Sequence, residues 1–342
     1  MIFKKPFLIA EISANHAGSF QKAKKLIMCA KKNGANAVKL QTYTPDSMTL
    51  RSSKKYFKIK SGLWKGYNLW DLYKKAQTPL IWHKKLFNYA KKIGITIFST
   101  PFDESAVDFL EELKCPFYKV SSFEMTDLPL IKKIAKTKKL MIISTGMANL
   151  DEIAMTVKCA KKNGSKKIVL LYCVSNYPSK NSDFNINNIN ILKKKFKCEV
   201  GLSDHSKDNL ISSLAISQGV KVIEKHIALE NQKKGLDLEF SLKGRQIKAF
   251  KKNMIETFDL LKNKNFLRNK SEDKNKIFRR SIFAVEDIKA GSKFLTTNIR
   301  RIRPGYGVEP RYYEKLINKK SPKDFLKGEP ITKLTLKKIK II

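Results

Sequence analysis

A short recurring phrase predicts that this chain is built from repeated strand–helix units. Ala-Lys-Lys-x-Gly ends at Gly34, Gly94 and Gly164, and a related segment runs from Ala215 to Gly219. Basic residues favour the last turn of a helix, and glycine readily adopts the left-handed conformation that follows it. An apolar, β-branched run begins soon after each glycine. Each phrase therefore predicts the end of a helix and the approach of a strand.

Eight apolar runs have the character of buried parallel strands, which are covered on both faces and so are continuously apolar. Helical patterns separate them, apart from a long insertion at 44–78 with aromatic and glycine content. Eight such units in about 250 residues predict a closed (β/α)8 TIM barrel. The alternative is an open doubly wound sheet, but no G-x-G-x-x-G follows the first run. The runs lie at about 6–13, 37–43, 96–102, 117–122, 140–146, 168–175, 198–205 and 220–227.

The barrel is expected to occupy residues 1–262, and the rest of the chain has a different character. Residues 263–280 are polar, rich in lysine and asparagine, and weakly patterned, which is typical of a linker. Residues 281–342 contain short strand-like runs that are broken by glycine and proline. They predict a separate small α+β or β-rich domain.

The net charge of +40 raises the question of nucleic-acid binding. The lysines are spread along the whole chain, and no repeated pattern of aromatic and basic residues suits base stacking. A basic nucleic-acid-binding protein on a degenerate barrel is thus an alternative from another class, and we expect no nucleic-acid partner. The charge should instead attract anionic substrates.

Cysteine usage and hydropathy bear on the compartment. The five cysteines are an odd, scattered set without C-x-x-C spacing, which argues against a disulfide framework and for a reducing compartment. No stretch approaches the roughly 20 apolar residues that a membrane-spanning helix needs. We therefore expect a cytoplasmic protein with no membrane partner.

Polar residues close all eight predicted strands. In a barrel of this kind the catalytic groups lie at the carboxyl ends of the strands, so these side chains should converge. The residues at successive ends are Glu11, Asn15 and His16; Lys39 and Gln41; Ser99 and Thr100; Lys119, Ser122 and Glu124; Ser144 and Thr145; Ser175, Asn176 and Tyr177; Ser203, Asp204 and His205; and Glu224, Lys225 and His226.

Two of the four histidines, His205 and His226, close neighbouring strands. A single histidine is most often a satisfied structural residue, but two at matching strand ends favour a metal site. Neutral imidazoles suit divalent transition metals, and two protein ligands leave positions for water and substrate. Asp204 and Glu224 are either supporting partners of these histidines or point outwards.

Lys39 and Lys119 interrupt apolar strands, where an unpaired ammonium group is costly to bury. A phosphate or carboxylate ligand would offset that cost, and Ser122 and Ser144 with nearby backbone N–H groups would complete the anion site. Schiff-base chemistry is the alternative for a barrel lysine. Two lysines with several hydroxyls favour anion binding.

On these motifs the chain resembles the sialic acid synthase family over nearly its full length, and within that family it is most similar to the pseudaminic acid synthase branch. The branch is indicated by three phrases: SANHAGS, QTYTPDS and GLWKGYNLWDLYKKAQTPLIWH. The phrases that indicate the family are AEISANHAGS (10–19), VKLQTYTPDSMTL (38–50), STPFD (99–103), YKVSSFE (118–124), ISTGM (143–147), CVSNYP (173–178), VGLSDHS (200–206), IEKHIAL (223–229) and RPGYG (303–307).

The resemblance implies a fold and an activity. The fold is a (β/α)8 barrel followed by an antifreeze-like (SAF) domain at 281–342, in a domain-swapped homodimer. The activity is condensation of phosphoenolpyruvate with an amino-sugar aldehyde, a 2,4-diacetamido-trideoxy hexose, to give pseudaminic acid and phosphate. A synthase of N-acetylneuraminate or legionaminate is the alternative.

The resemblance also implies roles for single residues. His205 and His226 match the metal ligands, usually for Mn2+, with Mg2+ or Co2+ as alternatives. Ser175 matches a substrate-binding position at which the neuraminate branch has asparagine, and Asp237 lies in GLDLEFSL instead of the usual G-P-D-H. The remaining matches are Glu11, Glu224 and Tyr177 as catalytic residues near the sugar, metal or attacking water; Lys39, Lys119, Ser122, Ser144 and Ser203 around phosphoenolpyruvate; and Asp237 and Arg303 at the acceptor sugar, the arginine reaching it across the dimer.

Overall fold

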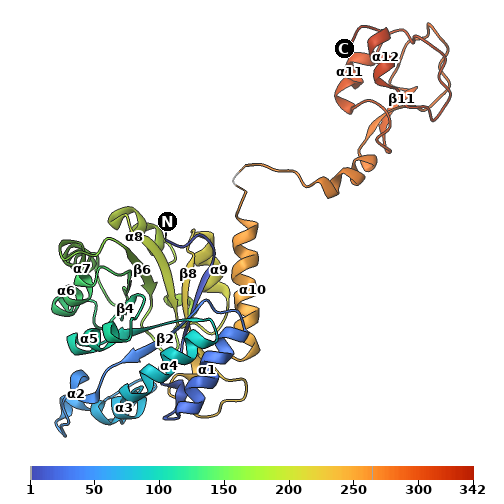
Figure 1. Ribbon diagram of the computed structural model, residues 1–342. Coiled ribbons are helices and arrows are strands. Elements are labelled where there is room, and N and C mark those ends of the chain that lie inside the picture. The colour runs from blue at the N-terminus through green and yellow to red at the C-terminus, as the bar shows by residue number, and fades with distance from the viewer. Residues whose placement is uncertain (1, 264) are drawn as a thin grey trace. The chain divides into compact units, whose positions relative to one another are not determined.

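The computed structural model describes residues 2–263 and 265–342. The chain divides into two compact units, one ending at Lys262 and the other beginning at Asn263 (Figure 1). Each unit has its own apolar core. The two are described separately below.

The first unit is a closed barrel of parallel strands, as the sequence predicts. The strands follow one another in chain order, and β1 pairs with β8 to close the sheet. A short strand, β9 (Leu242–Lys243), pairs with the end of β8. Each of the eight predicted runs overlaps one strand: β1 Phe7–Glu11, β2 Ala37–Thr42, β3 Thr96–Pro101, β4 Tyr118–Val120, β5 Met141–Ser144, β6 Ile168–Cys173, β7 Glu199–Asp204 and β8 Val222–Ala228.

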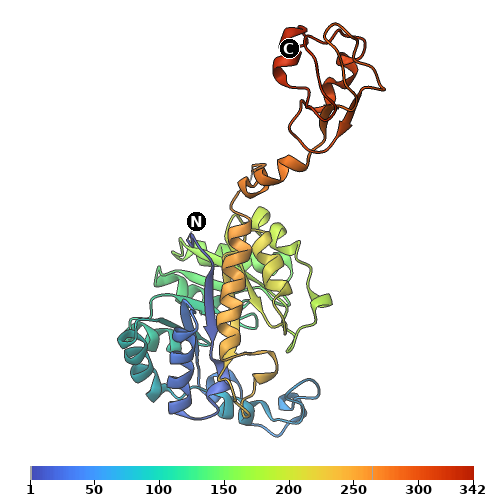
Figure 2. The ribbon, with the colours of Figure 1, turned by 90° about the vertical axis from the view of Figure 1, so that its right-hand side faces the viewer.

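Helices surround the strands and bury one face each against them (Figures 1 and 2). In the first helix, Ala23, Leu26, Ile27 and Ala30 form the buried stripe, at the spacing of one helical face. The glycines that the recurring phrase places after helices have positive φ, +83° at Gly34 for example, so these predicted helix ends are confirmed. The outer helices are α1 Phe20–Lys32, α4 Leu80–Lys92, α5 Glu104–Glu112, α6 Leu128–Lys136, α7 Leu150–Lys162, α8 Asn188–Phe196, α9 Leu210–Ser217 and α10 Arg245–Leu260.

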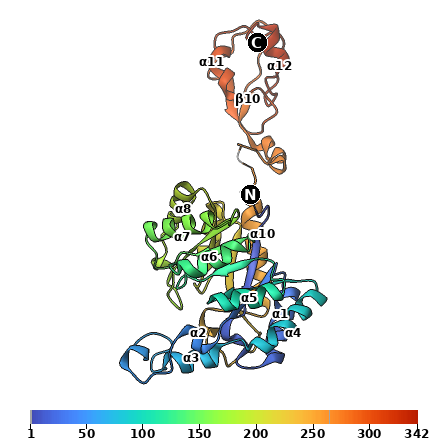
Figure 3. The ribbon, with the colours of Figure 1, turned by 60° about the vertical axis from the view of Figure 1, so that its left-hand side comes forward.

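The insertion at 44–78 lies between β2 and α4 and folds into short elements. These are α2 (Pro45–Met48), the 3-10 turn η2 (Lys55–Phe57) and α3 (Leu69–Ala76). Figures 1 and 3 show α2 and α3 together at one end of the barrel, away from the N-terminus. The other short turns of the barrel are η1 Ser13–His16, η3 Asn181–Asp183 and η4 Leu238–Phe240.

The second unit is a small α+β domain, as predicted for 281–342. Strands β10 (Ser281–Ala284) and β11 (Ile299–Ile302) pair antiparallel. The core includes Ile282, Phe294 and Phe325. Within the segment predicted as a linker, the 3-10 helix η5 (Lys270–Phe278) forms with every residue exposed, and residue 264 lies outside the described residues. The remaining elements are η6 Pro310–Tyr312, α11 Tyr313–Leu316 and α12 Lys333–Lys338.

Two compositional features have structural counterparts. All five cysteines carry free thiols. Across 2–263 and 265–342, no helix combines the length and the apolar character needed to cross a bilayer.

Candidate active site

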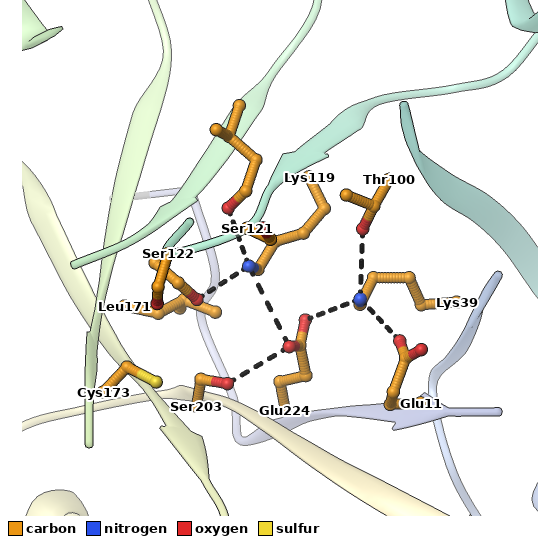
Figure 4. Close-up of polar contacts among 12 residues, drawn as sticks. Glu11, Lys39, Thr100, Lys119, Ser121, Ser122, Leu171, Cys173, Ser203 and Glu224 are labelled. Atoms are coloured by element: carbon orange, nitrogen blue, oxygen red, sulfur yellow. Dashed lines mark hydrogen bonds and ion pairs between the residues drawn. The ribbon is translucent and has the colours of Figure 1, made fainter. Parts of the chain in front are cut away.

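Two lysines and two glutamates form a buried charged network at the carboxyl ends of β1, β2, β4 and β8 (Figure 4). Lys39 Nζ lies 2.5 Å from Glu11 Oε2 and 3.8 Å from Glu224 Oε2. Lys119 Nζ lies 3.9 Å from Glu224 Oε1. The Glu224 carboxylate thus stands between two ammonium groups, and all four residues are at most 4% exposed.

Strand register explains how distant residues meet in this network. Glu11 lies opposite Lys39 on β2 and opposite His226 on β8, and Ser203 lies opposite Glu224. Side chains alternate between the two faces of a strand, so Glu224 and His226 share one face. The site is therefore a direct product of the closed parallel sheet.

Lys225 and Asp204 occupy the opposite face, between the strands and the outer helices. Lys225 Nζ lies 3.1 Å from Asp204 Oδ2 and 5.9 Å from the ring centre of Phe250 on α10. Asp204 also accepts hydrogen bonds from Ser212 Oγ (2.7 Å) and the Ser206 backbone N–H (2.8 Å). This resolves the alternatives left open by the sequence: Asp204 points outwards in a structural ion pair, and Glu224 points into the site.

Burial and charge give the four ionisable groups of the network different proton affinities. Burial raises the pKa of Glu11 to about 7, although Lys39 acts in the opposite direction. Burial also opposes ionisation of Glu224, but the Lys119 and Lys39 ammonium groups outweigh it and lower its pKa. Burial lowers the pKa of Lys119, with Glu224 offsetting part of the effect. Glu224 is therefore the fixed negative charge, and Glu11 exchanges a proton near neutrality.

Hydroxyl groups complete the polar surface around the lysines. Lys39 donates to Thr100 Oγ1 at 3.1 Å, and Lys119 donates to Ser144 Oγ at 2.7 Å and to the Val120 carbonyl at 2.8 Å. Ser203 donates to Glu224 Oε1 at 3.2 Å. The predicted residues Lys39, Lys119, Ser144 and Ser203 are thereby brought together.

The hydroxyl groups of Ser122 and Ser175 lie close to the backbone of Gly146. Ser122 Oγ accepts a hydrogen bond from the Gly146 backbone N–H at 3.1 Å. A Cβ atom added to Gly146 would collide with the hydroxyl oxygens of both serines. The absence of a side chain at residue 146 therefore lets both hydroxyls approach the backbone closely, which places two hydrogen-bonding groups next to each other.

The two predicted metal-binding histidines lie side by side, with ring centres 5.3 Å apart. His205 Nδ1–H donates to the Val174 carbonyl at 3.1 Å, which leaves its Nε2 free. His226 Nδ1 is buried without a hydrogen-bond partner and lies 3.7 Å from Asp237 Oδ2. Burial, then His205, holds the pKa of His226 well below its usual range, so its imidazole is neutral.

Two adjacent imidazoles offer the nitrogen-donor chemistry that a divalent transition metal requires. Within the part of the chain that the structure describes, no group of three or more His, Cys, Asp and Glu side chains is arranged to hold a metal ion. A cation on His205 and His226 would therefore complete its coordination with substrate and water.

A cavity of about 330 Å³ opens beside the histidines. Two of the residues predicted at the acceptor or the attacking water, Tyr177 and Asp237, line it together with His226. Tyr177 packs its ring 4.5 Å from His205 and 5.4 Å from Phe240. The remaining lining residues are Ser13, Ala14, Gln41, Tyr43, Met48, Ile59, Trp64, Leu69, Leu72, Tyr73, Ala76, Phe102, Ser121, Phe123, Glu124 and Leu236.

Asp237 is fixed by the loop that follows β1. Its backbone N–H donates to Asn15 Oδ1 at 3.2 Å, and its Oδ2 accepts from the Ala14 backbone N–H at 3.4 Å. Asn15 Nδ2 in turn donates to the Ile227 carbonyl at 2.9 Å, directly after His226. Burial raises the pKa of Asp237. The loop after β1 thus positions this carboxyl group at the histidine pair.

Arg303 belongs to the second unit and is exposed there. It lines a cavity of about 510 Å³ with three more arginines, Arg280, Arg300 and Arg301. Its predicted contact with an acceptor sugar across a dimer remains a prediction.

Sequence reasoning missed the wall of the cavity that comes from the insertion. Ile59, Trp64, Leu72 and Tyr73 follow no strand-end rule, and none was singled out. The sequence offered one signal for this wall. Residues 56–73 are unusually rich in aromatic side chains, and they extend a strand-to-helix connection that is normally short, which is typical of a functional loop.

Fold and site together define a (β/α)8-barrel protein with two buried lysines and two glutamates beside a histidine pair. The chain belongs to the NeuB family, whose model matches residues 26–265. A SAF domain matches residues 279–337, within the second unit.

Named relatives agree with this assignment. The chain is 42% identical to the pseudaminic acid synthase of Campylobacter jejuni subsp. jejuni over 96% of either chain. It is 37% identical to the N,N'-diacetyllegionaminic acid synthase of the same organism over 96% of this chain and 99% of the relative. The crystal structure of an N-acetylneuraminic acid synthetase from Leptospira borgpetersenii, in complex with citrate, is 29% identical with a TM-score of 0.70, covering 80% of this chain and 90% of that one.

Proposed function

We propose that this protein is an enzyme that condenses phosphoenolpyruvate with a 2,4-diacetamido-trideoxy hexose to give pseudaminic acid and phosphate. One observation carries the proposal: the buried network of lysines and glutamates reaches the histidine pair through Glu11, which lies opposite His226, and His226 lines a cavity of about 330 Å³. The pseudaminic acid synthase among the relatives supports the choice of acceptor over legionaminate or N-acetylneuraminate precursors.

In this proposal the lysines and serines hold phosphoenolpyruvate. Lys39 and Lys119 supply two positive charges, and the hydroxyls of Ser122, Ser144 and Ser175 supply donors near Gly146. Charge-assisted hydrogen bonds of this kind are strong and directional. They fix the phosphate and carboxylate so that carbon 3 faces the cavity.

The proposal includes a divalent cation, Mn2+ first, with Mg2+ or Co2+ as alternatives, held by His205 and His226. The donor set fits, because both imidazoles are buried beside each other and His226 Nδ1 has no hydrogen-bond partner. When bound, the cation would polarise the acceptor's carbonyl as a Lewis acid. Val174 fixes the ring of His205 through Nδ1–H, and so presents Nε2.

The proposed reaction makes one carbon–carbon bond and breaks one carbon–oxygen bond. Carbon 3 of phosphoenolpyruvate attacks the aldehyde carbon and positive charge develops at carbon 2, while the former aldehyde oxygen becomes a hydroxyl group by taking up the proton that the added water releases. Glu224, ionised between two lysines, stabilises that charge. Water adds to carbon 2 and loses a proton to a carboxylate, for which Glu11 is suited because its pKa is about 7. The bond from carbon 2 to the phosphate oxygen then breaks, leaving a ketone and inorganic phosphate, while Tyr177 orients the acceptor.

Two further parts of the proposal concern assembly and location. The functional form would be a homodimer in which the small domain of one chain covers the partner's barrel, so that Arg303 contributes to the acceptor site. The free thiols of all five cysteines suit the proposed cytoplasmic location.

The direct test is to incubate the purified enzyme with phosphoenolpyruvate, Mn2+ and each candidate hexose, and to measure phosphate release. We expect the highest kcat/KM with the 2,4-diacetamido-trideoxy hexose that leads to pseudaminic acid. Faster turnover of the legionaminate precursor or of N-acetylmannosamine would overturn the choice of acceptor. Trapping of a lysine adduct by borohydride in the presence of pyruvate would instead favour a Schiff-base lyase.

A further inference from the structure

The insertion presents Trp64 to the cavity from a fixed turn. The Ile59 N–H donates to the Tyr67 carbonyl and the Gly66 N–H donates to the Ile59 carbonyl, both at 2.9 Å. Gly62 and Gly66 have positive φ values of +79° and +93°, which glycine adopts without strain. These bonds close a small antiparallel loop, which fixes the backbone position of Trp64.

Trp64 is connected to the histidine pair through a single aromatic ring. Its ring centre lies 5.6 Å from that of Tyr177, and Tyr177 lies 4.5 Å from His205. Trp64, Tyr177 and His226 all line the same cavity. A sugar bound with its aldehyde near the histidines would therefore extend its other substituents towards Trp64.

The indole N–H of Trp64 is a buried donor with no hydrogen-bond partner. The neighbouring Trp70, on α3 of the same insertion, instead donates its N–H to Asp46 Oδ1 at 2.8 Å. An unsatisfied buried donor is costly, and an indole can only donate. The N–H has almost no accessible surface in this structure, so the indole must turn towards the cavity that its ring lines for an acceptor atom of the ligand to become its partner.

The surroundings of Trp64 restrict which acceptor atom that is. The insertion contributes an apolar wall that includes Ile59, Leu72 and Tyr73. A hydroxyl group against this wall would accept from the indole but leave its own O–H without a partner. An amide carbonyl only accepts, and its methyl group packs against apolar side chains.

We propose that Trp64 determines acceptor specificity by donating its indole N–H to the carbonyl oxygen of an acetamido substituent, whose methyl group packs on the insertion wall. The enzyme would thereby favour an acetamido, deoxygenated sugar over a polyhydroxylated one. This inference rests on the proposed function, since it assigns a role within the same acceptor site. Trp64 does not touch the reacting atoms and acts on binding.

The test compares Trp64→Phe with Trp70→Phe on three acceptors. The first acceptor carries both acetamido groups, and each of the other two has a hydroxyl in place of one of them. Phenylalanine keeps an apolar ring and removes the donor. We expect Trp64→Phe to raise KM for the first acceptor roughly three- to tenfold, the range for one lost hydrogen bond, with KM for phosphoenolpyruvate unchanged. Trp70→Phe should leave both values as in the wild type.

The hydroxyl analogues isolate the acetamido contact. With the analogue that lacks the recognised group, Trp64→Phe and the wild type should differ less than twofold. An equal loss on every acceptor, or an equal rise in KM for phosphoenolpyruvate, would overturn the assignment. So would an unchanged KM for the first acceptor in Trp64→Phe.

Binding provides a readout that does not depend on turnover. The chain has three tryptophans, so Trp70→Phe/Trp82→Phe leaves Trp64 as the single emitter. Adding the diacetamido acceptor should shift or quench its emission, and Trp64→Phe should weaken acceptor binding measured by calorimetry. If the acceptor changes Trp64 emission and binds Trp64→Phe more weakly but no phosphate is released, the proposed reaction is wrong and the role of Trp64 in binding stands. Binding of the acceptor with no change in Trp64 emission or affinity would overturn that role alone.

Discussion

The two sides of the active site are built in different ways. The charged side comes from strand ends: Lys39, Lys119 and Glu224 stand on β2, β4 and β8, and strand pairing fixes their spacing. The opposite side is an apolar wall from the insertion, with Trp64 held in a turn. The proposed anion site is thus part of the barrel itself, whereas the proposed acceptor contact at Trp64 comes from the insertion between β2 and α4.

The largest expected effect comes from the histidine pair, where the two sides meet. His226→Ala removes one of two imidazoles and should reduce phosphate release to background, because the remaining side chain cannot retain the proposed cation alone. Turnover at saturating Mn2+ is the measurement, and circular dichroism checks that the barrel is folded. Near-normal activity in the folded variant would contradict the metal role.

Removing a lysine from the charged side should lower catalytic activity and leave the stability of the fold unchanged. Lys119→Met deletes a donor to the proposed phosphate and should lower kcat/KM for phosphoenolpyruvate about 10²- to 10³-fold. The melting temperature should stay close to the wild-type value, because the Glu224 carboxylate keeps a second ion-pair partner in Lys39, 3.8 Å away. A variant that unfolds at lower temperature while it keeps its activity would contradict the division between the two sides.

The matched control is the buried lysine on the outer face of β8. Lys225→Met leaves the Asp204 carboxylate buried without its ion-pair partner, and should destabilise the fold by about 3–5 kcal/mol. Urea unfolding measures the loss. The double variant Asp204→Asn/Lys225→Met should recover part of it, because no uncompensated charge remains. Equal stability of the single and double variants would show that the pair is not coupled.

Arg303 tests whether the acceptor side extends beyond the barrel. Arg303→Ala should raise KM for the acceptor several-fold and leave KM for phosphoenolpyruvate close to the wild-type value, if this exposed arginine contacts the sugar in a dimer. Arg311→Ala, which removes another exposed arginine of the same domain, is the control. Equal losses in both Michaelis constants would argue against the contact.

The charged side could be predicted from the sequence because short-range rules determine it. Helix-ending glycines located the strands, and the barrel topology implied that the polar strand ends converge. The alternation of side chains along a strand also determines whether Glu224 points towards the histidines or outwards. If His226 faces inwards, Glu224 does so too, and Lys225 faces the helices, as the structure shows.

The apolar wall could not be predicted in the same way. Trp64 lies in a turn without helical or strand periodicity, and its contact with Tyr177 joins segments far apart in the chain. That contact depends on the path of the insertion, which no local pattern in the sequence determines. The aromatic content suggested a functional loop, but not which side chain keeps a free donor.

The central claim is that a cation on the histidine pair and an anion on the two lysines lie side by side. The most direct measurement is the relaxation of the phosphorus nucleus of phosphoenolpyruvate when Mn2+ is added to the enzyme. We predict strong paramagnetic broadening in the wild type, and none in His226→Ala at concentrations where phosphoenolpyruvate still binds. Binding of both ligands to the wild type without such broadening would contradict the account.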